Sequence, residues 1–240
     1  MSRDYDVEVM ALIPARGGSK GIHRKNLSLV GGLPLVAHSV LHALGCPKIT
    51  RTIVSTEDSE IRDAALRAGA EVPFCRPDAL AEDHVLDFDV FAHALDWLIS
   101  NEGYRPDIIV HLRPTSPIRR AAWIAESIDL LVSHPNADSV RSVSPVQQHP
   151  YRMFRKNDEG FLEPLLTVET PKPYELRRQD LPNIYYYNCV IDVTRHTTIQ
   201  VKRSMAGDRI LAYMMSPDDV VDIDSARDLR QAQVALPEPR

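Results

Sequence analysis

The sequence predicts an α/β fold, a mostly parallel sheet with helices on both of its faces. Short apolar runs of strand length alternate with longer helical segments over much of the chain, and the connections between them are short. The composition is ordinary for a globular protein, with 44% hydrophobic and 25% charged residues among 240. That length is enough for one large core, so we expect a single domain over residues 1–240.

The first half of the chain shows this alternation most clearly. Gly45 and Gly69 each follow a helical segment, as glycines that end helices do. Phe88, Phe91 and Leu95 share one face of another helical segment. In chain order we expect a strand at 7–13, a helix at 35–44, a strand at 49–55, a helix at 58–68, a short strand at 71–74, a helix at 88–100, a strand at 108–112, a helix at 121–133 and a strand at 138–143. Sheets of this kind bind ligands at the carboxyl ends of their strands.

The alternation stops between residues 145 and 187. This segment contains six prolines, several charges and short β-like pieces around Phe154 and Phe161, and it predicts a lobe inserted into the domain. After it we expect strands at 189–193 and 210–215 and a closing helix at 225–234. Ser225 and Asp228 have the spacing of a capping box at the start of that helix.

Charge and cysteine usage exclude several classes of protein. The net charge of −5 disfavours broad binding to nucleic acid. The three cysteines lie far apart and form no C-x-x-C pair, so we expect a reducing compartment, the cytoplasm. No apolar run approaches the length of a membrane span, so we expect no membrane partner. His38 and His42 have i, i+4 spacing, but nothing nearby supplies further zinc ligands.

The loop after the first expected strand is the most informative segment. Glycines at 17, 18 and 21 stand among Arg16, Lys20, Arg24 and Lys25. Glycines let backbone N–H groups turn toward an anion, and the four cations strengthen the attraction. The residue order fits neither a Walker loop nor the Gly-x-Gly-x-x-Gly fingerprint. We interpret the loop as a phosphate cradle of another type, with a flexible surface loop as the alternative.

Two acids near the chain's end form a second candidate site. Asp222 and Asp224 are spaced i, i+2, so in an extended backbone their side chains share one face. Two carboxylates, nucleotide phosphates and waters together would complete an octahedral Mg²⁺ site. Any polar strand end can show this pattern, but beside a phosphate loop it predicts a magnesium site.

Both segments resemble one known family, the acylneuraminate cytidylyltransferases, or CMP-sialic acid synthetases. The family's loop Ala-Arg-x-x-Ser-Lys-Gly-x-x-x-Lys-Asn is matched by Ala15, Arg16, Ser19, Lys20, Gly21, Lys25 and Asn26. Its ending Asp-Ile-Asp-x-x-x-Asp-Leu is matched by Asp222, Ile223, Asp224, Asp228 and Leu229. Similar pieces at 53–58, 76–81 and 112–119 extend the resemblance, with gaps, from residue 7 to about 233. It implies a Rossmann-like nucleotidyltransferase fold on which CTP lies across the strand ends.

The resemblance implies roles for the loop and the acids. Arg16 and Lys25 would bind the triphosphate and act in catalysis. The other nucleotide-binding positions would be Ala15, Gly17, Ser19 and Asn26 on the same loop and Arg76 near the cytosine. Asp222 and Asp224 would hold Mg²⁺, and the proton of the attacking hydroxyl would go to Asp224 or to a hydroxide on the metal. Arg76 could instead be a solvated charge in a turn.

The resemblance also implies a site for a keto sugar acid. Its residues would be Arg113, Thr115 and Ser116 in the Pro-Thr-Ser-Pro segment, Arg178 in the inserted lobe, and Asn188 at the strand that follows the lobe. Arg178 could instead pair with Glu175 on the lobe's surface. The lobe contains apolar residues, such as Phe154 and Phe161, that need cover, and the resemblance also implies a dimer. We therefore expect a homodimer in which the lobe crosses to the partner and brings Arg178 toward a sugar site.

The chain departs from the family pattern at three places. Arg113 stands where a glutamine is common, the segment 82–87 is acidic, and Asn188-Cys-Val-Ile-Asp192 replaces Asn-Gly-x-Ile-Tyr. A second guanidinium in the pocket would recognise an acid differently, for example bidentately. These departures put the identity of the sugar in doubt more than the reaction.

The expected reaction is transfer of CMP from CTP to the anomeric hydroxyl of a sialic-acid-like 2-keto-3-deoxy sugar acid, with release of pyrophosphate. One alternative is a nucleotidyltransferase that acts on a sugar phosphate or uses another nucleotide, although the usual Gly-Gly-x-Gly-Thr-Arg loop is absent. The other is a nucleotide-binding protein without catalytic activity.

Overall fold

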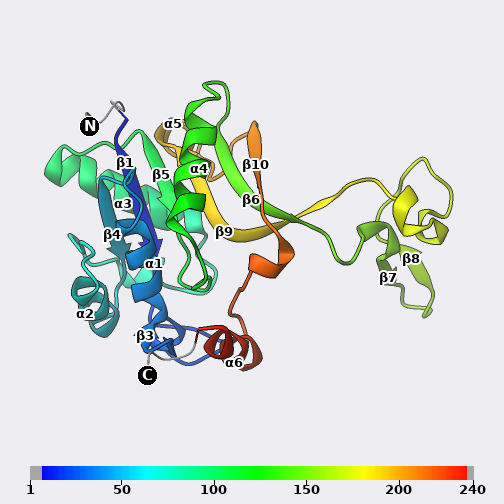
Figure 1. Cartoon of the computed structure of the whole chain (residues 1–240), viewed down its shortest axis with the longest axis horizontal. Helices are drawn as coiled ribbons and strands as arrows, with labels where there is room; N and C mark the ends of the chain where they lie inside the picture. The colour runs from blue at the N-terminus through cyan, green and yellow to red at the C-terminus, as the bar shows by residue number, and fades with distance from the viewer. Residues whose placement is uncertain (1–6, 237–240) are drawn as a thin grey trace.

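A six-stranded sheet forms the centre of the molecule in the computed structural model, which describes residues 7–236 (Figure 1). The strands lie in the order β10-β6-β9-β5-β1-β4. Their bounds are β1 (Val9–Pro14), β4 (Arg51–Ser55), β5 (Ile108–His111), β6 (Ser139–Pro145), β9 (Tyr185–Arg195) and β10 (Ile210–Met214). β9 runs antiparallel to β5 and β6, and the other neighbours are parallel. The predicted mostly parallel α/β fold is confirmed.

Helices cover both faces of this sheet. α1 (Leu35–Leu44), α2 (Ser59–Arg67) and α4 (Ala121–Val132) pack on one face, and α3 (Asp87–Glu102) and α5 (His196–Gln200) pack on the other. Figure 1 shows α1 and α4 in front of the strands and α3 behind them. β1 illustrates the reason: Ala11 and Ile13 face the first helical layer, whereas Met10 and Leu12 face the second. Alternate residues of a buried strand point to opposite faces, so β1 is apolar throughout.

The helices begin and end at the signals seen in the sequence. Asp58 caps α2 because its carboxylate accepts hydrogen bonds from the backbone N–H groups of Glu60 and Ile61. Ser225 and Asp228 form the predicted capping box of α6 (Ala226–Ala235). α6 packs on a hairpin of β2 (Leu29–Val30) and β3 (Leu33–Pro34), which the sequence analysis missed. No helix within residues 7–236 has both the length and the apolar character that a membrane span requires.

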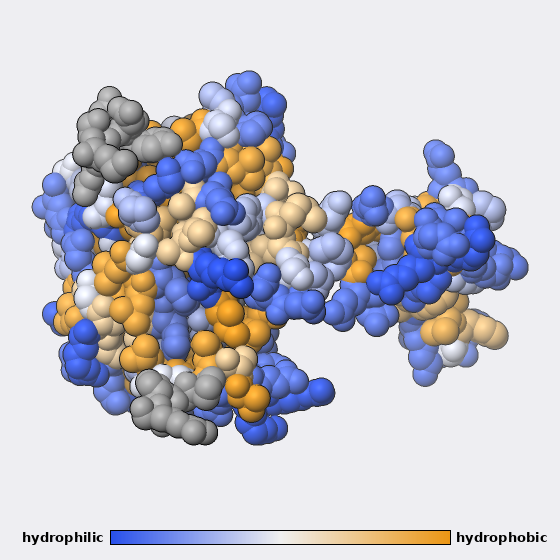
Figure 2. All heavy atoms as spheres, in the orientation of Figure 1, coloured by the Kyte–Doolittle hydropathy of each residue, from blue (hydrophilic) through white to orange (hydrophobic). Residues whose placement is uncertain are grey.

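The segment between β6 and β9 leaves the body of the molecule as a narrow arm (Figure 1). It contains a small antiparallel pair, β7 (Phe154–Lys156) and β8 (Leu162–Pro164). The arm also contains three short 3₁₀ turns, at η3 (Pro150–Arg152), η4 (Pro173–Glu175) and η5 (Arg178–Asp180), and irregular backbone between them. Figure 2 shows apolar surface on this arm, where Phe161 and Leu162 are 66% and 65% exposed.

Two expectations about strands differ from the structure. The strand expected at 71–74 is wrong: Glu71 forms one isolated bridge to Ile53, and Pro73 has no N–H group with which to extend the ladder. The strand expected at 189–193 begins earlier, at Tyr185, and bulges where Cys189 adopts a positive φ of 60°. The remaining 3₁₀ turns are η1 (Lys25–Leu27), η2 (Asp78–Leu80) and η6 (Pro217–Asp219).

Candidate active site

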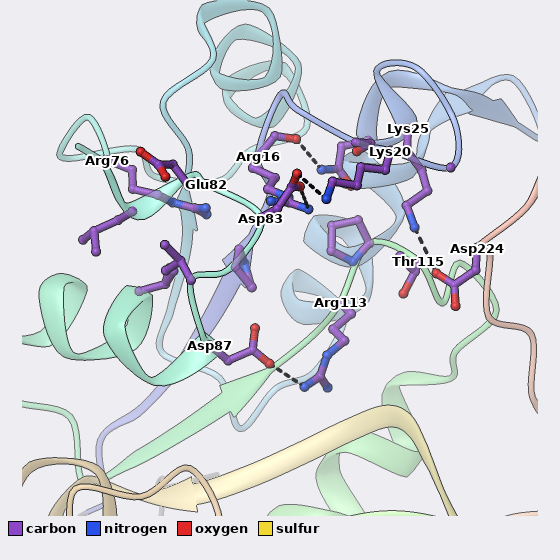
Figure 3. Close-up of a pocket in the computed structure, with 18 of the residues that line it drawn as sticks. Arg16, Lys20, Lys25, Arg76, Glu82, Asp83, Asp87, Arg113, Thr115 and Asp224 are labelled. Atoms are coloured by element: carbon purple, nitrogen blue, oxygen red, sulfur yellow. Dashed lines mark hydrogen bonds and ion pairs between the residues drawn. The ribbon is translucent and has the colours of Figure 1, made fainter. Parts of the chain in front are cut away.

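A cavity of about 410 Å³ opens where β1 and β5 end at their carboxyl termini. Its size falls in the usual range for small-molecule sites. Most of the predicted site residues line it, namely Arg16, Ser19, Lys25, Asn26, Arg76, Arg113, Thr115 and Asp224. The cavity therefore joins the glycine-rich loop, the segment after β5 and the acids near the end of the chain (Figure 3).

The glycine-rich loop is held in place by close backbone approaches. Gly17 donates its N–H to Glu57 Oε1 at 2.6 Å, and a Cβ on Gly17 would lie 2.6 Å from Asp58 Oδ2. A Cβ on Gly21 would lie 2.4 Å from the carbonyl oxygen of Asp224. Only glycine fits at both positions, because any larger residue would collide. Asn26 Nδ2 donates to the carbonyl oxygen of Arg16 at 2.8 Å and so fixes the loop from within.

The loop's cations face carboxylates across the cavity (Figure 3). Asp83 contacts both Arg16 and Lys20, at 2.8 Å each. Lys25 Nζ donates to the carbonyl oxygen of Ile223 at 2.8 Å and lies 3.2 Å from Asp224 Oδ1. Arg16, Lys20 and Lys25 thus gather at one wall, where a polyanion would exchange for the acidic side chains.

Asp222 and Asp224 approach the same wall from the end of the chain. Burial raises the pKa of the Asp222 carboxyl, and a hydrogen bond from Thr115 acts in the opposite direction. Asp224 lines the cavity and its side chain is 77% exposed. Within residues 7–236 no group of three or more His, Cys, Asp or Glu side chains could hold a metal ion. A cation held by these two acids would take its remaining ligands from substrate and water.

Arg76 forms another part of the wall and is buried rather than solvated in a turn. Its residue is 3% exposed, and its guanidinium donates to the Ser55 hydroxyl and carbonyl oxygens at the end of β4. Burial lowers the pKa of Arg76. A buried guanidinium at a strand end, inside the cavity, is suited to contact a polar ligand group.

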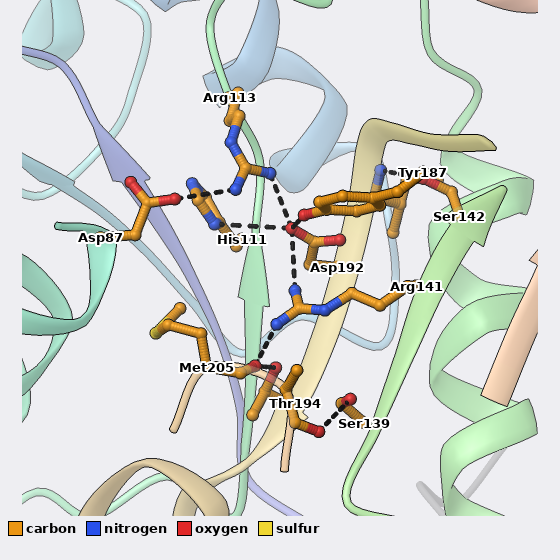
Figure 4. A network of polar contacts seen from close by, with 12 residues as sticks. Asp87, His111, Arg113, Ser139, Arg141, Ser142, Tyr187, Asp192, Thr194 and Met205 are labelled. Atoms are coloured by element: carbon orange, nitrogen blue, oxygen red, sulfur yellow. Dashed lines mark hydrogen bonds and ion pairs between the residues drawn. The ribbon is translucent and has the colours of Figure 1, made fainter. Parts of the chain in front are cut away.

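Arg113 lines the cavity and also belongs to a network of charges that extends from it to β9 and β6 (Figure 4). Its Nη1 lies 2.6 Å from Asp192 Oδ2, and its Nη2 lies 2.8 Å from Asp87 Oδ2. The fully buried Asp192 also contacts Arg141 at 2.8 Å and accepts a hydrogen bond from the Tyr187 hydroxyl at 2.5 Å. Although burial opposes it, the contact with Asp192 leaves the pKa of Arg113 above its usual range. A substrate carboxylate would have to displace both acids to be held bidentately by Arg113.

The other predicted site residues lie outside the cavity lining. Ala15 and Ser116 are fully buried beside it. Asn188 is fully buried in β9, where it accepts from Ser142 Oγ at 2.6 Å and donates to Ser144 Oγ at 3.0 Å, so it braces β6 against β9. Arg178 lies on the arm and lines a separate hollow at the arm's base. Gly17 and Asp222 approach the cavity without lining it.

Sequence reasoning missed several residues of the site. Asp83, Asp87 and His111 line the cavity, and Asp192 with Arg141 holds Arg113 from below. The acidic segment 82–87 and the replacement ending at Asp192 were visible as departures from a family pattern. Their partners lie far away in the sequence, so the contacts themselves could not be seen.

The model of a family described as "Cytidylyltransferase" matches residues 10–236. The chain belongs to the cytidylyltransferase family. The match covers every part of the cavity, from the glycine-rich loop to Asp224.

Several curated relatives of this cytidylyltransferase are similar in sequence. An N-acylneuraminate cytidylyltransferase of Streptococcus agalactiae serotype V is 30% identical over 221 residues, covering 91% of this chain and 51% of the relative. The chain thus spans about half the length of that relative. Post-translational flagellin modification protein B of Campylobacter coli is 27% identical, with 96% of both chains covered. A pseudaminic acid cytidylyltransferase of Campylobacter jejuni is 29% identical, with 74% of both covered.

Solved structures share the fold. A CMP:2-keto-3-deoxy-manno-octonic acid synthetase complexed with CTP has a TM-score of 0.71 at 15% identity, covering 95% of this chain and 98% of that one. A 4-diphosphocytidyl-2C-methyl-D-erythritol synthase from Anaerococcus prevotii has a TM-score of 0.63 at 10% identity, covering 96% and 98%. Because these sequence identities are low, the similarity to these two structures shows the fold alone.

Proposed function

We propose that this cytidylyltransferase transfers CMP from CTP to the anomeric hydroxyl of a sialic-acid-like 2-keto-3-deoxy sugar acid and releases pyrophosphate. One observation carries the proposal: Arg16, Lys20 and Lys25 meet Asp224 in a single cavity at the strand ends. Relatives named for N-acylneuraminate and pseudaminic acid support the choice of acceptor.

The cavity's cations suit displacement at a polyanion. Negative charge builds on the leaving pyrophosphate as its bond to the α-phosphorus breaks, and fixed positive groups stabilise that charge. Lys25 is anchored by the carbonyl oxygen of Ile223, so its ammonium is positioned before substrate binds. The carboxylate of Asp224 at 3.2 Å from Lys25 is our candidate acceptor for the sugar hydroxyl's proton.

We further propose that Mg²⁺ takes part and that Asp222 and Asp224 hold it. The donor set fits, because Mg²⁺ prefers carboxylate oxygens and is commonly bound by one or two of them together with substrate phosphates. When bound, the ion would neutralise phosphate charge and orient the triphosphate. Because the pKa of Asp222 is raised, the Mg²⁺ requirement should grow as the pH falls and that carboxyl becomes protonated.

The metal proposal is tested by replacing each acid separately. Asp222→Asn and Asp224→Asn should each raise the Mg²⁺ concentration needed for half-maximal activity, since one carboxylate ligand is lost. Asp219→Asn is a matched control, because Asp219 lies on η6 just before the site and does not line the cavity. If both site variants showed the same Mg²⁺ dependence as the wild type, Asp222 and Asp224 would not be Mg²⁺ ligands.

The reaction itself is tested with purified protein, MgCl₂ and a panel of acceptors and nucleotides. Pyrophosphate should appear with CTP and at least one of N-acetylneuraminic, legionaminic and pseudaminic acids, and mass spectrometry should find the CMP-sugar. ATP, GTP and UTP should be poor substitutes. Pyrophosphate release only with a sugar phosphate as acceptor, or no release with any pair, would contradict the proposal.

We also propose that the protein is a cytoplasmic homodimer. The arm carries exposed Phe161, Leu162 and Leu166, which an arm of this size cannot bury by itself. A second copy of the chain would cover this apolar surface and leave both arms crossed between the two bodies. The cytoplasmic location is supported by the free cysteines, Cys46, Cys75 and Cys189.

A further inference from the structure

His111 stands apart from the other polar residues of the cavity. It is the last residue of β5 and only 1% exposed, yet it lines the cavity. Neither of its ring nitrogens has a hydrogen-bond partner among the described residues. Nδ1 lies 3.7 Å from Asp192 Oδ2, too far for a hydrogen bond. A buried imidazole without partners is costly for the protein, so it calls for a partner from outside the chain.

The ring's surroundings indicate where such a partner would bind. Figure 4 shows the second nitrogen of His111 pointing toward the contact between Asp87 and Arg113. All three residues line the cavity, and the ring of Phe91 packs against the imidazole with 4.6 Å between ring centroids. His111, Asp87 and Arg113 thus form one polar end of the cavity, which we call the His111 corner.

The charges of the His111 corner decide what kind of group fits. Arg113 contacts both Asp87 and Asp192, and Arg141 contacts Asp192 as well, so the carboxylates here already serve as counter-ions to arginines. Burial lowers the pKa of His111 well below its usual value, with Arg113 adding to the effect, so the ring is neutral. A further carboxylate in this corner would face the carboxylate of Asp87. A neutral group that both donates and accepts hydrogen bonds has no such conflict.

We infer that the His111 corner recognises a hydroxyl or amide group of the sugar acid, and that His111 contacts this group directly. Asp87 accepts a hydrogen bond, Arg113 donates one, and the imidazole can do either through its free nitrogen. A site built to hydrogen-bond a polar substrate group discriminates strongly against analogues that lack it. The corner would therefore select among sugar acids. This inference rests on the proposed function.

The test compares three purified variants with the wild type, using CTP, MgCl₂ and whichever sugar acid of the panel the wild type uses best. In His111→Leu the KM for the sugar acid should rise about 10-fold, the loss expected for one or two hydrogen bonds. The KM for CTP should stay within about twofold, because the corner lies away from the loop cations. His111→Gln should recover part of the loss, since an amide keeps both a donor and an acceptor.

Stability separates recognition from a purely structural role. Leucine removes two buried polar atoms that lack partners, so ligand-free His111→Leu should unfold at a temperature no lower than the wild type does. His196→Leu is the matched control: His196 is 4% exposed, its Nδ1 also lacks a partner in the described part of the chain, and it does not line the cavity. That control should leave the KM for the sugar acid unchanged.

The outcomes distinguish the inference from the proposed function. If the wild type is active and the KM of His111→Leu for the sugar acid lies within twofold of the wild-type value, the inference is overturned but the proposed function is not. If His111→Leu unfolded at a lower temperature and its KM rose equally for CTP and for the sugar acid, the inference would be overturned in favour of a structural role for His111. A wild type that releases no pyrophosphate with any sugar acid would overturn both.

Discussion

Lys25 shows how one residue joins the two ends of the chain. Its ammonium, on the loop after β1, is held by Ile223 and Asp224, nearly two hundred residues later. Its side chain is 16% exposed, whereas that of Lys20 on the same loop is 78% exposed. A cation that is partly buried and anchored stabilises developing charge more than a mobile one does.

Lys25→Ala should lower kcat/KM for CTP by roughly 100-fold or more, because charge on the leaving pyrophosphate loses a fixed partner. Steady-state kinetics measure this effect, and circular dichroism checks that the fold survives. Lys20→Ala serves as the control and should cost much less. If Lys25→Ala had the kinetics of the wild type, Lys25 would not take part in catalysis.

In the proposed reaction, Asp83 is a counter-ion that CTP would displace from the loop cations. It contacts Arg16 and Lys20, and its side chain is 44% exposed. Exposed ion pairs are weak, so Asp83→Asn should lower the KM for CTP by only about 2- to 5-fold. The difference should shrink at high salt. Asp78→Asn on η2, outside the cavity, is the control, and a raised KM in Asp83→Asn would show that Asp83 helps to bind the nucleotide instead.

The start of β6 illustrates how single elements are fastened to one another. Asp138 Oδ2 accepts hydrogen bonds from Lys202 Nζ at 2.8 Å and from the backbone N–H groups of Asp208 and Arg209 at 2.9 and 3.0 Å. These contacts, led by the one with Lys202, lower the pKa of Asp138 from 3.8 to about 2. One carboxylate thereby ties the segment before β10 to β6.

Asp138→Asn should reduce the free energy of unfolding at pH 7 by about 1 kcal/mol, because the charged acceptor is lost. The folded-state pKa is lowered, so this stabilisation is present above pH 3.8 and is lost as the pH falls through about 2. Urea unfolding of both proteins at several pH values measures the difference. A difference that stayed constant down to about pH 2 would show that the charge of Asp138 contributes nothing.

The alternation of elements could be predicted from the sequence because each strand and helix carries its own periodicity. α1 and the capping box of α6 follow the predicted signals closely. The antiparallel direction of β9 could not be predicted, since an apolar run of strand length has no direction in its composition.

The candidate site also has parts that could be predicted from the sequence and parts that could not. The glycine-rich loop and the Asp222–Asp224 pair are local patterns, so the sequence pointed to them. His111 looked like an ordinary strand residue, and the segment that holds Asp83 and Asp87 was visible only as an acidic departure from the family pattern. Only the fold brings Asp83 to Arg16 and Asp87 to Arg113, because those contacts depend on tertiary packing.

The whole molecule consists of a body that contains the cavity and an arm whose apolar surface is exposed. Light scattering at micromolar concentration should give twice the mass of one chain, because the exposed side chains of the arm need a partner surface. The double variant Phe161→Ser and Leu162→Ser should shift this mass toward the monomer. A wild-type monomer with full activity would contradict the dimer.

The proposed dimer allows a test of whether the arm completes the partner's site. If Arg178 acts in the partner's site, Arg178→Ala and Lys25→Ala chains are each inactive alone. Each mixed dimer then contains one intact site. Random subunit exchange of equal amounts should restore about a quarter of the wild-type activity. No recovery after demonstrated exchange would place Arg178 in its own chain's site or outside any site.

The central claim is that the anomeric hydroxyl of a sugar acid attacks the α-phosphorus of CTP. It is tested most directly with a sugar acid that carries ¹⁸O at the anomeric hydroxyl, after a control has shown that the label persists during the assay. Attack by this hydroxyl predicts ¹⁸O in the bond between the sugar and the phosphorus of the CMP-sugar, with unlabelled pyrophosphate. A CMP-sugar without ¹⁸O, or the absence of any CMP-sugar, would contradict the claim.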